Sequence, residues 1–246
     1  MVMHMVAYYE HLTDAKTNYP ILAVPDETIS IDEQDVQVPA ANKIIHACAV
    51  GAALSEVRIN SPSLRAMYPF YVSPIETNNY ISKNDVVIDL RNNPLELVIE
   101  ESMNAEVTTT GASDPIIGLL MADAVPAPVT GKIFSVKATS NTTLVPYQWT
   151  NCEIEFDVDI PAGEYDIVGF RAESNGAVLA RIVFKGEAYR PGVFALQTDS
   201  STNIKEFRNG NYGLFGSFKH NVKPSVEVLS RTADTSEIFY FDLIKK

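Results

Sequence analysis

The sequence predicts an all-β chain built from two similar halves, and three observations lead to this prediction. Short strand-like runs, each closed by Pro, Gly, Asn, Asp or Ser, recur along most of the chain. Several short sequence matches recur in the same order about half a chain apart. A proline-containing seam lies between the two sets of matches. Because 246 residues suffice for two domains of ordinary size, we expect two β-sandwiches in tandem.

The first 17 residues precede these runs and are unusually apolar for a chain end. Met1, Met5, Tyr8, Tyr9 and Leu12 have roughly helical spacing, which predicts a short helix or arm over residues 1–17. The stretch has no basic segment before it and so lacks the form of a signal peptide. Such an arm would pack on its own domain, or dock on a neighbouring subunit or a lipid surface.

The strand-like runs after the arm number at least eight in each half, at the spacing of a sandwich or jelly roll. No later stretch has the apolar periodicity of a long amphipathic helix. The predicted strands are Ile21–Val24, Thr28–Ile31, Val36–Val38, Ile44–Val50, Glu56–Ile59, Pro69–Val72, Val86–Leu90, Leu95–Glu100, Glu106–Thr109 and Ile116–Met121, followed by Lys132–Ala138, Glu153–Ile160, Tyr165–Ala172, Val178–Phe184, Val193–Gln197, Tyr212–Lys219, Ser225–Ser230 and Glu237–Ile244.

The internal repeat consists of three weak matches that are persuasive only together. Each is short enough to arise by chance, but all three keep the same order and nearly the same offset, which predicts a duplicated unit. At offsets of 122, 123 and 121 residues they pair Asp35–Ala40 with Asp157–Ala162, Val57–Ile59 with Ala180–Ile182, and Glu106–Val107, Ala112 and Ile117 with Glu227–Val228, Ala233 and Ile238.

The seam contains Pro126 and Pro128, which cannot continue a strand ladder, and Gly131, which frees a turn. We therefore divide the chain into an N-terminal arm (1–17), a first sandwich (18–125), a short linker (126–131) and a second sandwich (132–246). Two Asn-rich segments, Glu76–Asn84 and Thr198–Asn211, are expected to be long loops, one in each half.

The run from Glu153 to Ile160 alternates acidic and apolar residues. As a strand it would place Ile154, Phe156 and two further apolar side chains on a core face and four carboxylates on the other face. Those carboxylates (Glu153, Glu155, Asp157 and Asp159) form either a solvated face or a candidate site for a structural calcium ion. We expect no other cofactor.

Composition narrows the classes of function. The net charge is −12 and no cluster of basic residues stands near either chain end, so direct binding of nucleic acid is not expected. The two cysteines, Cys48 and Cys152, are too few for a disulfide framework and are expected to be buried thiols. No run approaches the about 20 apolar residues that span a bilayer.

Catalytic signatures are missing from the sequence. There is no nucleophile elbow, zinc-protease helix, dinucleotide-binding glycine pattern or phosphate-binding loop. None of the four histidines, His4, His11, His46 and His220, stands beside both a carboxylate and a nucleophile in a triad-like pattern. We therefore predict a structural or binding protein without catalytic residues.

The predicted chain resembles the double-jelly-roll major capsid proteins of icosahedral viruses, many of which enclose a membrane. The resemblance lies in two tandem eight-stranded sandwiches, a short seam, an apolar N-terminal arm and the lack of a catalytic motif. The resemblance covers residues 18–246 and rests on architecture and duplication. It implies two upright jelly rolls per copy and a homotrimer with a pseudo-sixfold outline that tiles the shell. It also implies a location in the virion after synthesis in the host cytoplasm.

The partners implied by the resemblance are other copies of the chain, minor capsid proteins and an internal lipid membrane, with no direct contact to nucleic acid. The side chains expected to make assembly contacts belong to the arm and to loop aromatics. They are Met1, Met3, Met5, Tyr8, Tyr9, Tyr80 and Phe207.

An alternative hypothesis is a tandem β-sandwich module that binds carbohydrate or mediates adhesion. Trp149, Tyr147 and Tyr189 are the aromatic residues that would stack on a sugar. A capsid protein is expected to form a stable trimer and larger shells, whereas a lectin would stay small and be retained on a sugar matrix.

Overall fold

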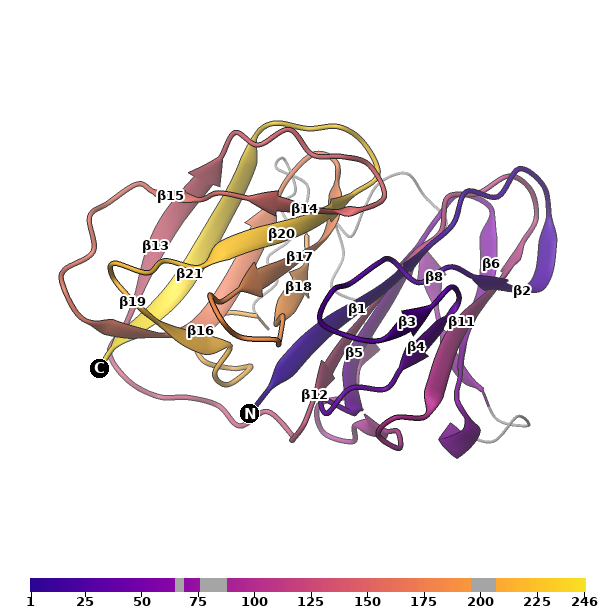
Figure 1. Ribbon diagram of the computed structural model, residues 1–246, viewed down its shortest axis with the longest axis horizontal. Coiled ribbons are helices and arrows are strands. Elements are labelled where there is room, and N and C mark those ends of the chain that lie inside the picture. Colours follow the sequence, from indigo (N-terminus) through magenta and orange to yellow (C-terminus); the bar gives the residue numbers. More distant parts are fainter. Residues whose placement is uncertain (65–68, 76–87, 196–206) are drawn as a thin grey trace. The chain divides into compact units, whose positions relative to one another are not determined.

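The computed structural model describes residues 1–64, 69–75, 88–195 and 207–246 and is all-β over these ranges, as the sequence predicted (Figure 1). Its helical content among the described residues is one short 3-10 turn, η1 (Pro62–Leu64). None of the described helices is long and apolar enough to cross a membrane. The predicted loop Glu76–Asn84, most of Thr198–Asn211, and Tyr80 lie outside the described residues.

The chain divides into two compact units. The N-terminal unit comprises Met5–Val125, and the C-terminal unit comprises Pro126–Lys246 together with Met1–His4. The division falls at the start of the proline-containing seam, between Val125 and Pro126. Each unit contains two mainly antiparallel sheets.

In the N-terminal unit one sheet is centred on β5 and β12 and the other on β11 and β6. The order of hydrogen-bonded strands in the first sheet is β1 (Met3–Tyr9), β12 (Ile116–Ala122), β5 (Lys43–Val50) and β10 (Leu95–Glu96). Strands β8 (Pro74–Ile75) and β9 (Ile88–Asp89) also pair with β5. The second runs β3 (Ile31–Asp32), β4 (Asp35–Gln37), β11 (Ser102–Thr109), β6 (Leu54–Asn60), β7 (Phe70–Val72), with β2 (Lys16–Ile21) also on β11.

The C-terminal unit has the same plan with longer strands. Its first sheet runs β15 (Glu155–Phe156), β13 (Ile133–Ser140), β21 (Glu237–Lys245), β16 (Glu164–Glu173), β19 (Gly216–Lys219). Its second sheet runs β14 (Trp149–Cys152), β20 (Ser225–Ser230), β17 (Ala177–Val183), β18 (Gly192–Phe194).

The two units share one nested order of strand pairing. In the C-terminal unit the outermost strands in sequence, β13 and β21, pair with each other, then β14 with β20, β16 with β19, and β17 with β18. In the N-terminal unit the corresponding pairs are β1 with β12, β2 with β11, β5 with β9 and β10, and β6 with β7.

The repeat found in the sequence falls on equivalent strands. Val57–Ile59 lies in β6 and its match Ala180–Ile182 in β17, the fourth strand of each nested set. Glu106 and Glu227 lie in the seventh strands, β11 and β20. The third match is less regular, because β4 at Asp35 pairs with β11 whereas β15, just before Asp157, pairs with β13.

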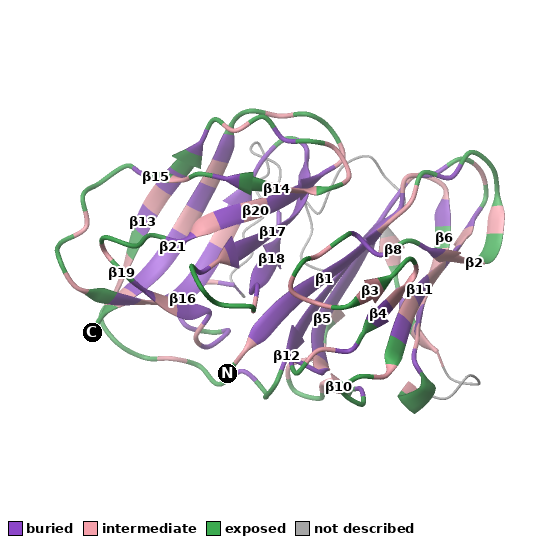
Figure 2. Cartoon of the chain, in the orientation of Figure 1, coloured by how far each residue is buried: buried purple, intermediate pink, exposed green. Residues whose placement is uncertain are grey.

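The cores differ in composition. The C-terminal unit packs a chain of aromatic rings, in which Phe170 contacts Phe239 and Phe241, Phe241 contacts Phe156, and Tyr165 stacks on Phe218. The N-terminal core is mainly aliphatic, and every residue of β12 and seven of the eight in β5 are buried (Figure 2). Strands covered on both faces have continuous apolar runs instead of alternation.

The predicted N-terminal helix is wrong. Residues Met3–Tyr9 form strand β1, the first strand of a sheet, and six of its seven side chains are buried. Tyr8 is fully buried and donates a hydrogen bond from its hydroxyl to the carbonyl oxygen of Met103, 3.0 Å away. The apolar N-terminus is therefore part of the folded core and does not form a separate arm.

The acidic–apolar run 153–160 is also corrected. Only Glu155 and Phe156 form a strand, and Val158, predicted to face the core, is 51% exposed. Its repeat partner Val36 is fully buried. The alternation in this segment therefore does not extend through a full strand, and Val36 and Val158 are not structurally equivalent.

Candidate interaction surfaces

Burial shifts the pKa values of both cysteines and of His46. Burial raises the pKa of the Cys48 thiol far above its usual range and that of Cys152 to about 12, so neither is a thiolate nucleophile near neutral pH. Burial also lowers the pKa of His46 to about 3. The nearby Asp89 carboxylate favours the charged ring and so opposes this effect, but burial outweighs it. His46 is therefore neutral in the folded protein.

Within the described ranges, no group of three or more His, Cys, Asp or Glu side chains is placed to hold a metal ion. The carboxylates of Glu153, Glu155, Asp157 and Asp159, proposed above as calcium ligands, lie in these ranges and do not form such a group.

An ion pair crosses strands β6 and β11 on the N-terminal unit. Arg58 and Glu106 are directly opposite in the antiparallel register, and Nε of Arg58 donates to Oε2 of Glu106 at 2.5 Å. Tyr71 of β7 lies opposite Arg58 on its other side and is 54% exposed. The two charged side chains keep 24% and 20% of their surface exposed. This row of side chains therefore belongs to a partly solvated sheet face.

The same ion pair recurs in the C-terminal unit. Arg181 of β17 and Glu227 of β20 are opposite in register, and Nε of Arg181 donates to Oε2 of Glu227 at 2.6 Å. Here the side chain of Arg181 is only 2% exposed, and its guanidinium lies 4.1 Å from the centroid of the Trp149 ring. The duplicated pair is thus partly exposed in one unit, whereas in the other its arginine is buried.

A shallow groove runs beside the exposed ion pair. It has a volume of about 510 Å³ and follows strands β6 and β11. Cross-strand hydrogen bonds order its side chains, from Asn60 to Asn104 at 3.2 Å and from Asn104 to Asp35 at 3.1 Å. The lining residues are Asp35, Arg58, Asn60, Ser61, Pro62, Ser102, Asn104 and Glu106. We name this surface, with Tyr71, the β6–β11 face.

The C-terminal unit has a contrasting face on β13, β21 and β16. Tyr240 lies opposite Lys137 on one side and Arg171 on the other, so the three side chains share one sheet face. Arg171 and Arg208 approach the Tyr240 ring to 5.7 and 5.8 Å from its centroid. These residues are half-buried, and we name them the β13–β21–β16 face.

A buried carboxylate anchors that face. Asp242 is fully buried, and burial alone would raise its pKa, but hydrogen bonds from Arg208, Ser135 and the backbone of Asn209 outweigh this and lower it. Arg208 donates from Nε to Oδ2 at 2.7 Å and from its terminal nitrogen to Oδ1 at 2.6 Å. This bidentate contact fixes the guanidinium next to Tyr240.

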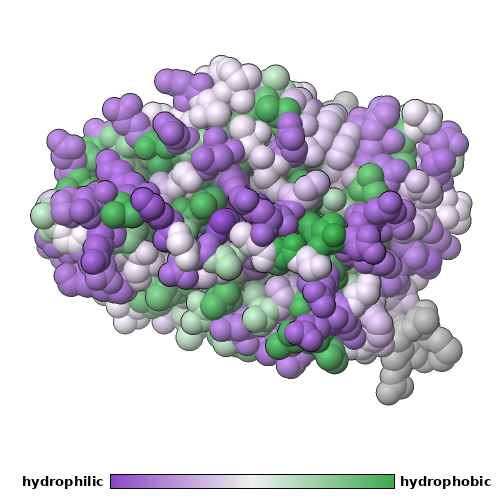
Figure 3. All heavy atoms as spheres, in the orientation of Figure 1, coloured by the Kyte–Doolittle hydropathy of each residue, from purple (hydrophilic) through white to green (hydrophobic). Residues whose placement is uncertain are grey.

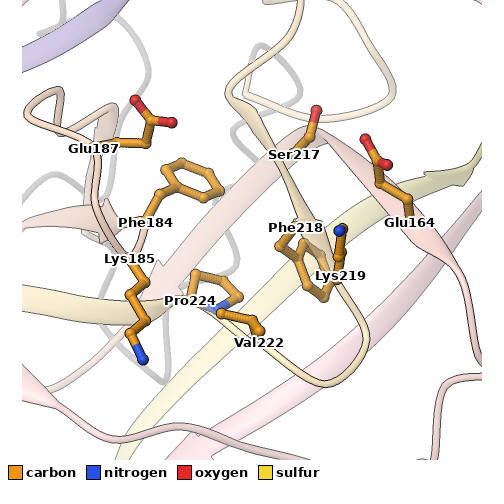
Figure 4. Close-up of a pocket in the computed structure, with 9 residues that line it drawn as sticks. All are labelled: Glu164, Phe184, Lys185, Glu187, Ser217, Phe218, Lys219, Val222 and Pro224. Carbon is orange, nitrogen blue, oxygen red and sulfur yellow. The ribbon is translucent and has the colours of Figure 1, made fainter.

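A pocket of about 260 Å³ lies at one loop end of the C-terminal unit. Figure 4 shows the rings of Phe184 and Phe218 on opposite sides of it, with Pro224 and Val222 between them. Phe184 follows strand β17, and Val222 belongs to the turn between β19 and β20. The remaining lining residues are charged or polar and form the rim: Glu164, Lys185, Glu187, Ser217 and Lys219.

The residues predicted as assembly contacts are mostly inside the fold. Met3, Met5 and Tyr8 are 0–1% exposed in β1, and Tyr9 is half-buried. Only Met1 of this set is exposed, at 41%, while Tyr80 lies outside the described ranges. Phe207, predicted to lie on a loop surface, is buried and stacks on Tyr212 with ring centroids 4.4 Å apart. In this fold the buried members are unavailable to a neighbouring copy.

The aromatic residues of the carbohydrate hypothesis contact their own chain. Trp149 stacks on the guanidinium of Arg181, and Tyr189 packs against Phe184 with ring centroids 5.6 Å apart. A sugar-stacking platform needs an open ring face. None of these contacts favours the carbohydrate hypothesis.

Comparison with known proteins identifies no family. No family model matches the chain, and no curated protein matches it. Solved structures that align include the major capsid protein P2 of bacteriophage PM2, at 11% identity and a TM-score of 0.23, covering 98% of each chain. A Paenibacillus xanthan lyase aligns at 10% identity and a TM-score of 0.23, over 92% of this chain and 24% of the lyase. Likenesses of this size carry no conclusion about function.

Proposed function

We propose that this chain is a structural capsid protein of the double-jelly-roll kind, which assembles as a homotrimer and then as a shell. The observation that carries the proposal is the duplicated Arg–Glu pair on equivalent strands of two units with the same nested strand order. A jelly roll is an eight-stranded, two-sheet fold made of two Greek keys, and the pairing of the first strand with the last in each unit supports the proposal.

The difference in burial between the two pairs suggests which surfaces other copies cover. In the C-terminal unit the face that carries Arg181 is covered, whereas in the N-terminal unit the equivalent β6–β11 face is open. Conversely, β5 and β12 are covered on both faces, whereas the equivalent strands β16 and β21 leave Arg171 and Tyr240 half-exposed. Each open face thus has a covered counterpart in the other unit.

The two open faces are the natural partners of each other between copies. Packing the β6–β11 face of one copy on the β13–β21–β16 face of the next makes a heterologous contact, which closes into a ring when the rotation allows. On the first face Asp35 adds a negative charge to the Arg58–Glu106 pair. On the second face Lys137 adds a positive charge beside Arg171, which pairs with Glu173, so the excess charges of the two faces are complementary. Three copies with two similar units each would have the pseudo-sixfold outline expected above.

A charge swap tests this contact without breaking the pair inside the chain. The double variant Arg58→Glu/Glu106→Arg keeps the net charge and an internal ion pair but reverses the pattern offered to a neighbour. We expect the unmodified chain to be a trimer in light scattering and the swapped chain to dissociate, with its melting temperature changed little. Lys132→Glu, at an exposed lysine directly before β13, is the control and should remain trimeric. A monomeric unmodified chain, or a swapped chain that still trimerises fully, would overturn the proposal.

A further inference from the structure

The loop between β10 and β11 presents an exposed aliphatic tip. Val98 is 60% exposed and Ile99 is 50% exposed, although their neighbour Leu97 is buried. Exposed aliphatic side chains at a loop end are ordinary when single, but two adjacent ones on an ordered loop form a small apolar knob. We call Val98 and Ile99 the aliphatic tip.

Hydrogen bonds hold this tip in one conformation. The carboxylate of Glu101 accepts from the backbone N–H of Val98 at 3.2 Å and from that of Ser63 at 2.9 Å. It also accepts from the hydroxyls of Ser61 and Ser63. On the other side, the N–H of Glu100 donates to the carbonyl oxygen of Val38 at 2.9 Å. A tip fixed in this way loses little conformational entropy when it is bound.

The pocket between Phe184 and Phe218 is the complementary feature. Its floor is apolar, and Val222 on its edge is 42% exposed. An apolar cavity of about 150 Å³ holds a benzene molecule, so about 260 Å³ has room for a branched aliphatic side chain. The pocket is therefore large enough for one residue of the tip.

The charges around the two features are opposite. Lys185 and Lys219 line the pocket together with Glu164 and Glu187, and Lys223 follows Val222 in the same turn. One rim carboxylate, Glu164, is already paired with Lys246 at 2.9 Å. The tip is flanked by Glu100 and Glu101, and by Glu96, which pairs with Lys43 at 3.2 Å. Because Lys246 neutralises Glu164, the three lysines outnumber the remaining rim carboxylate, Glu187, and this excess of positive charge favours an acidic partner segment.

We propose that the aliphatic tip of one copy inserts into the Phe184–Phe218 pocket of a second copy. The inference rests on the proposed function, in which copies of this chain surround one another, and it adds a second contact to the sheet-face contact described above. The tip and the pocket are different surfaces, so the contact is heterologous and can propagate through a lattice.

Disulfide trapping between two single-cysteine variants tests the contact directly. A tagged Val98→Cys chain is mixed with an untagged Val222→Cys chain at assembly concentration and oxidised with diamide. The native Cys48 and Cys152 are buried with raised pKa values and stay unreactive. We expect a heterodimer on a non-reducing gel that dithiothreitol removes. The matched control pairs Val98→Cys with Val145→Cys, since Val145 is 44% exposed but lies outside the pocket.

A heterodimer yield no greater than that of the control pair would overturn the proposal. Light scattering of the unmodified chain separates this failure from failure of the proposed function. Trimers without trapping reject the tip contact alone, whereas a chain that stays monomeric rejects both. As a second readout, Ile99→Asp and Val222→Asp should each weaken particle formation about tenfold or more, because a charge replaces an aliphatic group that the proposed contact buries. Val145→Asp should assemble normally, and equal assembly of all three variants would also count against the contact.

Discussion

Nε of Arg181 lies 2.6 Å from Oε2 of Glu227, and Cζ of Arg181 lies 4.1 Å from the centroid of the Trp149 ring. Only 2% of the Arg181 side chain is exposed to solvent. Its sequence counterpart, Arg58, makes the same cross-strand bond to Glu106 but stays partly hydrated. One chain therefore contains a matched pair of interactions that differ mainly in burial.

This matched pair predicts unequal costs for the same substitution. Arg181→Met leaves Glu227 as a poorly solvated charge, so we expect a loss of about 3–5 kcal/mol in the free energy of unfolding. Arg58→Met removes a more hydrated pair and should cost about 1 kcal/mol or less. Denaturant titration of both variants measures the difference. Equal losses would show that solvent reaches both sites alike.

The N-terminal strand is expected to be needed for folding. Removing residues 1–9 deletes β1 and leaves an edge of β12 unpaired, so the truncated chain should lack a cooperative unfolding transition. Met5→Ala is a milder test, because it empties a fully buried site and should cost about 2–5 kcal/mol. Met1→Ala, at the exposed end, should change stability by about 0.5 kcal/mol or less. A truncated chain that unfolds cooperatively like the full chain would contradict the assignment of β1 to the core.

Stability near neutral pH should depend on Glu237. Burial, with a smaller contribution from Asp234, raises the pKa of this carboxyl to about 7 from an ordinary value of 4.5. The folded state therefore binds the proton more tightly than the unfolded state, and the stabilisation is complete below the unfolded pKa and lost as the pH rises through about 7. We expect Glu237→Gln to raise the melting temperature at about pH 8 and to leave it nearly unchanged at about pH 4. A gain of equal size at both pH values would exclude ionisation of Glu237 as the cause.

Gly169 is expected to be intolerant of a side chain. A Cβ atom there would lie 2.4 Å from Oδ2 of Asp242, the carboxylate that Arg208 and Ser135 hold in place. Gly169→Ala should therefore displace that network and cost about 1–3 kcal/mol. Gly111→Ala is the control, since the nearest atom to its Cβ would be 3.9 Å away. Thermal unfolding of both variants compares the two sites, and similar stabilities would mean that the Asp242 network adjusts freely.

The sequence predicted the all-β class and the positions of most long strands, because strand-like runs and turn residues are local signals. The match between Val57–Ile59 and Ala180–Ile182 also identified strands with the same place in the pairing order. The cross-strand bonds of Arg58 and Arg181 were not predicted, since partners 48 and 46 residues away, respectively, become visible only through the strand register.

The N-terminus was misread for a physical reason. A strand that is buried on both faces, such as β1, shows no alternation between apolar and polar residues, so helical spacing can arise by chance. Phe207 was misplaced because the loop residues around it are polar, whereas the ring itself packs between Phe194 and Tyr212. The pocket at Phe184 and Phe218 combines residues of β16 and β19 with residues that follow β17 and β19, so no single stretch of sequence indicates it.

The nested pairing of strands has a consequence for how the chain reaches its fold. Ile133, near the start of the C-terminal unit, lies opposite Ile244 near its end. In the N-terminal unit the first strand, β1, likewise pairs with the last, β12. The ladder between the first and last strands of each unit can therefore form only after the last strand has left the ribosome. Until then β13 can pair with the two-residue strand β15 but not with β21. Contacts between strands so far apart in the sequence form slowly, and the apolar first strands can form non-native pairs before their native partners are available. Cellular yield should then depend on chaperone capacity during synthesis more than on the final stability of the product.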